Sequence, residues 1–340
     1  MSVNRNHSID LFRYIFAIMV VAIHTALFSD VNAELYFYVV GIICRLAVPF
    51  FAICTGYFLK KQLKNSVFNA PVSCLPFVKQ WKKLFHLYLF WSIIYLFFSI
   101  PMWIKIDWFS MWAFIDYGIG TLTKGSHYHL WFILSMLYAV PVMYVTVAKS
   151  NHKFQIAAAV VLYSVKAVIY GYRPFLPDTI NKIFSVMDKF SGFTDAVFCI
   201  LPFMLIGYCM DNCKEISKRK AFLLFLGYLT LWIAEAKLAK VFGVVSYSYL
   251  FFLFPASYYL FALIRDLKIS NKNIAEYKLN ELSLYVYCIH PIFIETLSQI
   301  QLPTLILFVV VSVLSTAIGL AMIKIKNKTK SSNEVKICSN

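Results

Sequence analysis

The chain has 340 residues, of which 61% are hydrophobic and only 14% are charged. Soluble globular proteins carry about 25% charged residues, so this composition excludes an ordinary soluble fold and indicates an integral membrane protein. The net charge of +16 is not by itself a sign of nucleic-acid binding, because basic residues gather in the cytoplasmic loops of membrane proteins.

Repeated apolar runs of about 20 residues, the length that crosses a bilayer, predict an all-α polytopic helical bundle. The ten expected transmembrane helices are residues 9–28, 35–58, 84–104, 130–148, 154–170, 193–210, 221–236, 244–264, 281–300 and 303–323. Most of the 32 Lys and Arg residues fall in the terminal segments and in alternate connections, which predicts that both termini are cytoplasmic. No Pro-, Gly- or Ser-rich linker divides the chain, so we expect one transmembrane domain over residues 1–330 and a short polar tail at 331–340.

The first predicted span contains an acid, a guanidinium and an imidazole among apolar residues. Arg13 and His24 are 11 residues apart, which is about 20° beyond three full rotations of a helix, and Asp10 falls about 40° from His24. The three side chains therefore share one helix face. Because ionisable groups inside a membrane usually face a bundle interior or a water-filled path, this face predicts a polar seam. The alternative is that Asp10 and Arg13 are interfacial residues and that His24 is hydrogen-bonded near the helix exit.

The second and the ninth predicted spans also carry ionisable residues at membrane depth. Arg45 lies in the second span, too far from either end to reach the interface easily, and needs a partner such as Asp10 or another carboxylate. His290 and Glu295 lie in the ninth span beside Pro291, which frees a backbone carbonyl one turn earlier and bends the helix. A lone histidine in a span is often a packing residue. Two histidines in separate spans, each near charged residues, favour a functional role.

The segment before the third span has one cationic face. It contains, at the spacing i, i+3, i+4 and i+7, Lys79, Lys82, Lys83 and His86. A helix would present these residues together at the inner membrane surface. One interpretation is an ordinary anchor that follows the positive-inside rule. The other is a patch that binds the phosphates of an anionic cytoplasmic cosubstrate.

Two further features predict no site of their own. None of the eight cysteines forms a CxxC pair or a zinc-binding spacing, so we expect reduced thiols and no metal site. The aromatic residues of segment 105–129 suit sugar stacking, but they suit an interfacial belt equally well, and we favour the belt for most of them.

These motifs together resemble the acyltransferase-3 family of integral membrane acyltransferases. The first span matches the family signature of an arginine, ten residues and a histidine, here Arg13 to His24, preceded by Asp10. Residues 45–57 are similar to the family's second segment, with Thr55 where the family usually has serine. Three more segments match in order: lysines at 79–83 in place of the usual arginines, His-Leu-Trp-Phe at 129–132, and residues 283–291. The layout resembles surface-polysaccharide O-acetyltransferases such as the enterobacterial common antigen enzyme, and the membrane domains of the serine racemases of vancomycin resistance look similar too.

The resemblance implies transfer of an acyl group, usually acetyl from cytoplasmic acetyl-CoA, to a hydroxyl of a cell-surface glycan or lipid-linked saccharide. It implies a multi-pass protein of a bacterial inner or cytoplasmic membrane, with membrane lipids around it and no nucleic-acid partner. Acetyl-CoA would be a cosubstrate, and no bound cofactor is expected. On this hypothesis the CoA phosphates would be bound by cationic residues, with four candidates: Lys79, Lys82, Lys83 and Arg45.

The same hypothesis assigns roles to the ionisable residues of the first and ninth spans. His24 would be the general base on the acceptor hydroxyl or, alternatively, a covalent carrier of the acyl group. Arg13 would hold a phosphate or polarise the thioester carbonyl, and Asp10 would pair with Arg13 or Arg45. His290 and Glu295 would orient the acceptor or His24.

Two other functions fit part of the sequence. A transporter or flippase of a small polar or amino-acid substrate would explain charges inside the membrane, but the chain lacks the internal repeats and broken helix pairs that mark many transporters. A sensor or scaffold subunit would need longer soluble segments than this sequence offers.

Overall fold

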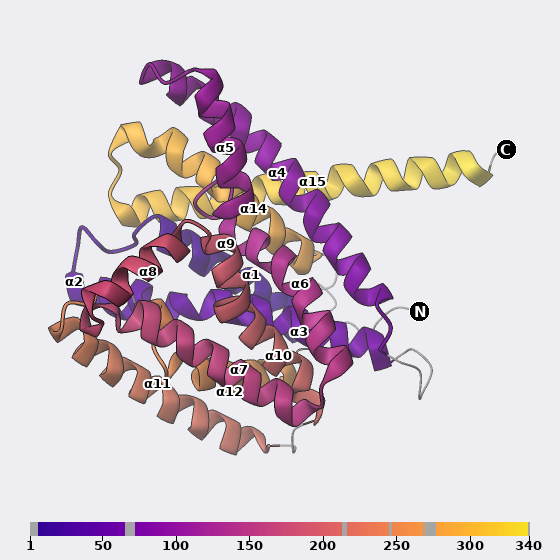
Figure 1. Ribbon diagram of the computed structural model, residues 1–340. Coiled ribbons are helices and arrows are strands. Elements are labelled where there is room, and N and C mark those ends of the chain that lie inside the picture. Colours follow the sequence, from indigo (N-terminus) through magenta and orange to yellow (C-terminus); the bar gives the residue numbers. More distant parts are fainter. Residues whose placement is uncertain are drawn as a thin grey trace. The chain divides into compact units, whose positions relative to one another are not determined.

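The computed structural model describes residues 6–64, 72–212, 216–244, 247–267, 269 and 277–338. Every regular element in this part of the chain is a helix, so the predicted all-α class is confirmed. The longer helices (Figure 1) are α1 (His7–His24), α3 (Ala47–Lys64), α4 (Leu75–Lys105), α5 (Met111–Thr123), α6 (Trp131–Lys149), α7 (His152–Lys166), α8 (Asp178–Asp188), α10 (Leu201–Cys209), α11 (Lys218–Val241), α12 (Leu253–Asp266), α14 (Leu279–Leu297) and α15 (Thr304–Cys338).

Shorter elements connect these helices or continue them. They are α2 (Ala33–Tyr36), η1 (Phe37–Ile42), η2 (Ile43–Leu46), η3 (Ala167–Gly171), η4 (Arg173–Phe175), α9 (Ser191–Asp195), η5 (Ala196–Ile200), η6 (Met210–Asn212), η7 (Tyr247–Tyr249) and η8 (Ser298–Ile300). The second predicted span is irregular, because η1 is a π-helix and η2 a 3₁₀-helix before α3 begins at Ala47. Pro49 lies in the first turn of α3, where its missing N–H and fixed φ are tolerated.

Eight stretches in the described part of the chain are long and apolar enough to cross a membrane, against the ten that the sequence predicts. They are His7–His24, Ala33–Leu63, Leu75–Lys105, Trp131–Lys149, His152–Gly171, Ser191–Asn212, Lys218–Val241 and Thr304–Thr329. The other two predicted spans differ for separate reasons. Residues 244–264 contain α12, which has only 14 residues, and α14 has 19 residues but includes Asn280, Glu281 and Glu295, which lower its apolarity.

The chain divides into two compact units. We call Val48–Ala262 the central unit, and Ser2–Ala47 together with Leu263–Asn340 the terminal unit. The single domain expected over residues 1–330 stays a prediction.

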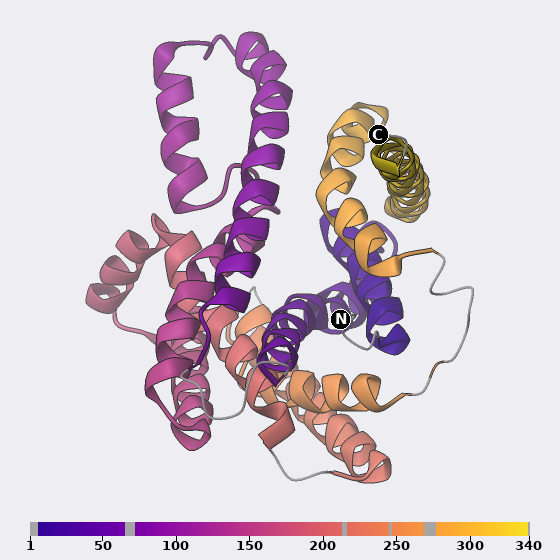
Figure 2. The same ribbon diagram turned by 90° about the vertical axis from the view of Figure 1, so that its right-hand side faces the viewer.

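In the terminal unit, α14 packs against both α1 and α15. Figure 2 shows α14 running beside α15. The two helices approach closely at Gly319, where a Cβ atom would lie 2.8 Å from Leu282 Cδ1. Tyr14 of α1 and Thr316 of α15 share a hydrogen bond of 3.0 Å between their hydroxyls. Pairing of the chain's two ends is therefore what forms this unit.

The N-terminus of α15 is attached to the loop that follows α1. The carboxylate of Asp30 accepts hydrogen bonds from the backbone N–H of Thr304, at 2.9 Å, and from its hydroxyl. These bonds hold the pKa of the Asp30 carboxyl below its usual 3.8. The Thr304 hydroxyl oxygen also accepts the N–H of Phe28 at 3.0 Å. An acidic side chain at a helix N-terminus is stabilising because it satisfies free N–H groups and interacts well with the helix dipole.

In the central unit, two glycines let α3 and α10 approach backbone to backbone. A Cβ atom on Gly56 would lie 1.9 Å from the carbonyl oxygen of Met204, and one on Gly207 would lie 2.2 Å from that of Ile53. Small residues at such crossings are typical of membrane helices, whose association depends on close packing rather than on a hydrophobic driving force.

Replacing Gly56 with alanine should therefore destabilise the central unit by about 1–3 kcal/mol, the usual cost of forcing extra atoms into a packed contact. The measurement is unfolding of the purified full chain in mixed micelles. Gly118→Ala in α5 is the matched control, because a Cβ there meets nothing within 4 Å. The control should gain about 0.5–1 kcal/mol, since alanine suits a helix interior better than glycine. Equal stability of the two variants would contradict the close crossing.

Candidate functional site

The first predicted span forms one continuous helix, α1, which carries all three of its ionisable residues. It begins at the N-cap Asn6, whose side chain accepts the N–H of Ile9 at 3.2 Å. It runs without a break to His24, and the chain then turns through Ala26 and Phe28, which have positive φ values of 49° and 71°. The predicted helical spacing between Arg13 and His24 is therefore present in the structure.

Asp10 and Arg13 form an ion pair at the start of α1. Arg13 Nη1 lies 3.9 Å from Asp10 Oδ1, and the exposed fractions of the two side chains are 23% and 6%. The guanidinium extends toward the N-terminus of the helix, which is the usual direction of side chains on a helix. Since His24 is at the other end of α1, Arg13 reaches away from it.

His24 lies against His290, which belongs to α14 in the same unit. The two imidazole rings are stacked, with centroids 5.2 Å apart and planes inclined by 28°. His290 is fully buried, whereas His24 is half-buried. His290 Nδ1 lies 3.1 Å from the carbonyl oxygen of Val286. A carbonyl can only accept a hydrogen bond, so Nδ1 carries the proton and the ring is held in one orientation. The structure thus brings together the two histidines that the sequence indicated separately.

Glu295 and Arg45 are placed differently. Glu295 follows His290 by five residues on α14, which is about 140° further around the helix, so the two side chains do not share a face. Arg45 lies in η2, which packs against α1 within the terminal unit. Its Nε atom is buried and has no hydrogen-bond partner among the residues that the structure describes. Asp10 forms its ion pair with Arg13, one of the two partners expected for it.

The three lysines proposed for phosphate binding lie in the central unit, on the first turns of α4. Lys79, Lys82 and Lys83 are exposed. The predicted helical face is present, because α4 begins at Leu75 and joins this segment to the third span in one helix of 31 residues. His86 follows on the same face, with Nδ1 2.6 Å from the carbonyl oxygen of Lys82.

A buried ion pair in the central unit was not predicted from the sequence. Lys166 Nζ contacts Asp195 Oδ1, with exposed side-chain fractions of 2% and 10%. The ammonium also lies 3.2 Å from the ring centroid of Tyr170 and 4.5 Å from that of Tyr249. A lysine in the fifth span and an aspartate at the start of the sixth were visible signals, but only the folded chain pairs them.

The arrangement in the terminal unit suits proton transfer. A half-buried imidazole supported by a second, oriented imidazole can accept a proton from a hydroxyl. Within the described residues, no group of three or more His, Cys, Asp or Glu side chains is placed to hold a metal ion. Fold and site together define a polytopic helical membrane protein with ionisable groups inside its terminal unit.

Comparison with known proteins places this chain in a family. The family model described as an acyltransferase domain, that of the acyltransferase-3 family, matches residues 6–324. The chain therefore belongs to this family of membrane acyltransferases. No solved structure matches it.

The curated relatives are named as racemases and not as acyltransferases. An amino-acid racemase of Enterococcus faecalis is 28% identical over 352 residues, covering 97% of this chain and 48% of the relative. A serine/alanine racemase of Enterococcus gallinarum is 25% identical over 296 residues, covering 84% of this chain and 40% of the relative. The chain thus spans less than half the length of these relatives.

Proposed function

We propose that this protein is a membrane O-acyltransferase that moves an acyl group, acetyl in the simplest case, from cytoplasmic acyl-CoA to a hydroxyl of a cell-surface glycan or lipid-linked saccharide. The observation that carries the proposal is the stacking of His24 on His290 at 5.2 Å, in a chain of the acyltransferase-3 family. We place it in the cytoplasmic membrane of a bacterium. The bacterial source of its relatives supports that location.

In this proposal His24 is the general base. Its ring takes the proton of the acceptor hydroxyl while the hydroxyl oxygen attacks the thioester carbonyl. When the tetrahedral intermediate collapses, the carbon–sulfur bond breaks, and the proton passes from His24 to the departing CoA sulfur. His290 would keep the His24 ring oriented, because its own ring is fixed by Val286 and stacks on it.

For Arg13 we favour binding of a phosphate over polarisation of the thioester carbonyl. The 11 residues from Arg13 to His24 correspond to about 16 Å along α1, and the guanidinium points the other way, toward Asp10. One carbonyl group cannot contact both side chains. The extended phosphopantetheine arm of CoA has a length of the same order, so phosphates near Arg13 and a thioester near His24 are compatible.

The cationic face of α4, in the central unit, is a separate candidate site for CoA phosphates. Replacing Lys79 and Lys82 together with alanine should raise the KM for acetyl-CoA by about tenfold, because two charge-assisted contacts are lost, and should leave kcat nearly unchanged. The exposed residues Lys149 and Lys153 offer a double alanine control of equal charge change, which should have little effect. An unchanged KM in the first variant would reject this phosphate site.

The acceptor class is tested by comparing the surface glycan of cells with and without the gene by mass spectrometry. The proposal expects a species heavier by one acetyl group only when the gene is present. Identical glycan masses, in cells that make the protein, would reject the glycan acceptor.

Movement of an amino acid across the membrane is the second candidate, favoured by the names of the racemase relatives. It would use the ionisable residues of the terminal unit as a substrate path. Vesicles containing the purified chain distinguish the two candidates. Uptake of labelled serine or alanine without acyl transfer would support transport and contradict the acyltransferase.

A further inference from the structure

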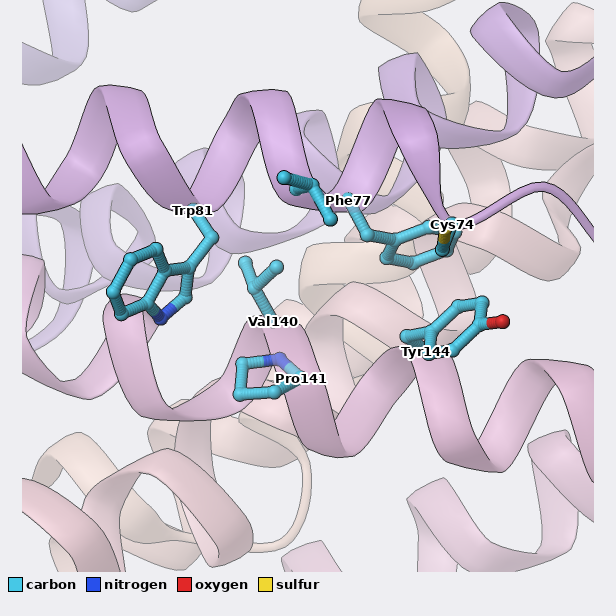
Figure 3. A pocket seen from close by; sticks show the side chains of 7 residues that line it. Cys74, Phe77, Trp81, Val140, Pro141 and Tyr144 are labelled. Carbon is cyan, nitrogen blue, oxygen red and sulfur yellow. The ribbon is translucent and has the colours of Figure 1, made fainter.

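An apolar groove lies on the surface of the central unit, between the first turns of α4 and the middle of α6 (Figure 3). It has a volume of about 260 Å³ and is lined by Cys74, Phe77, Val78, Trp81, Val140, Pro141 and Tyr144. Phe77 is buried, whereas Trp81 and Val78 are 36% and 42% exposed. The groove is small for a drug-sized ligand, but a single alkyl chain fits it.

Aromatic rings shape this groove. Phe77 of α4 contacts Tyr144 of α6, with ring centroids 5.3 Å apart. Trp81 stacks on Phe85, with centroids 5.3 Å apart and planes inclined by 9°. Between the Phe77–Tyr144 pair and the Trp81–Phe85 pair, α6 lines the groove with the short side chains of Val140 and Pro141. The groove is therefore the space above these two small residues, and the aromatic rings on either side form its walls.

One edge of the groove is cationic. Lys82 follows Val78 by one helical turn on α4, about 40° around the helix axis, and is exposed. His86 and Lys79 lie further round on the same side, and both are exposed. The predicted topology puts this end of α4 at the cytoplasmic leaflet, where anionic lipids concentrate.

We propose that this groove is a binding site for an anionic phospholipid, with one acyl chain in the groove and the phosphate against Lys82. A carbon-lined groove beside a cation matches a molecule that joins an alkyl chain to a phosphate. The pantetheine arm of CoA fits poorly, because its amide groups would lose their hydrogen bonds to water there. The groove shares Lys82 with the proposed site for CoA phosphates, so lipid binding is measured without acyl-CoA.

The test uses Trp81 as its own reporter. The purified full chain is reconstituted in two sets of phosphatidylcholine vesicles. One set contains phosphatidylglycerol brominated on its acyl chains, and the other contains the same fraction of phosphatidylcholine brominated in the same way. Bromine quenches tryptophan fluorescence on contact, and the difference between the parent chain and Trp81→Phe isolates the Trp81 signal. Trp112 in α5 is the control, since it is 74% exposed and does not line the groove. Its signal is isolated with Trp112→Phe.

We expect Trp81 to be quenched more strongly by the brominated phosphatidylglycerol, with a preference of about fivefold in apparent affinity, the value of one lysine near an anionic surface. Trp112 should be quenched equally by the two lipids. Lys82→Gln should remove the preference at Trp81, and Val140→Phe, which fills the groove, should weaken quenching of Trp81 by both lipids. Equal quenching of Trp81 by the two lipids, or a preference unchanged in Lys82→Gln, would overturn the proposal.

Discussion

His24→Ala should reduce acyl transfer by about 10²–10⁴-fold, the usual loss when a general base is removed. The expected loss falls on kcat, because His24 acts on the hydroxyl proton and not on the CoA phosphates. The measurement is the rate of label transfer from radiolabelled acetyl-CoA by the purified chain in vesicles. His152→Ala is the matched control, because His152 is an exposed residue at the start of α7, and it should keep the parent rate.

The same variant separates the two roles considered for His24. A covalent carrier would leave label on the protein when acetyl-CoA is present and the acceptor is absent. A general base would leave the protein unlabelled. Label on the parent chain that disappears in His24→Ala would therefore replace the base assignment with the carrier assignment. Full transfer activity in His24→Ala would exclude both.

Lys166→Ala should destabilise the protein by about 3–5 kcal/mol, because it leaves the Asp195 carboxylate buried without its cation. The two tyrosine rings that surround the ammonium would lose their cation–π contacts as well. Denaturant titration of the full chain in mixed micelles measures the change in the free energy of unfolding. Removing both charges, in Lys166→Met with Asp195→Leu, should restore much of the loss, since an apolar pair of similar volume avoids the desolvation cost.

The ion pair of Arg173 and Asp188 provides the comparison. Its side chains are 31% and 38% exposed, with Arg173 Nη1 2.8 Å from Asp188 Oδ2. Solvent screens such a pair, so Arg173→Ala should cost no more than about 1 kcal/mol. A loss in Lys166→Ala no larger than that in Arg173→Ala would show that the buried pair is not what stabilises this part of the central unit.

Local features of the site were predictable from the sequence because they depend on helix periodicity. The shared face of Asp10 and Arg13 and the cationic face of α4 both follow from residue spacing on one helix. The number of spans was harder to predict. The sequence around α12 and α14 is apolar overall, although α12 is a short helix and α14 contains polar residues.

Contacts between helices could not be predicted in the same way. Lys166 and Asp195 are 29 residues apart, and nothing in their local sequence says that their helices pack together. The crossing at Gly56 and Gly207 likewise depends on the packing of two helices, α3 and α10, that are far apart in the sequence. The stacking of His24 on His290 joins the two ends of the chain. Helix spacing marked each histidine as unusual, and only tertiary packing placed the rings together.

The central claim is that the terminal unit carries an acyl-transfer site built on His24. Its most direct test incubates the purified full chain in vesicles with acetyl-CoA labelled in the acetyl group and with lipid-linked and free saccharides from the cell surface. The claim predicts label in the saccharide for the parent chain and for His152→Ala, and none above background for His24→Ala. Saccharide label that is equal in His24→Ala and the parent chain would contradict it.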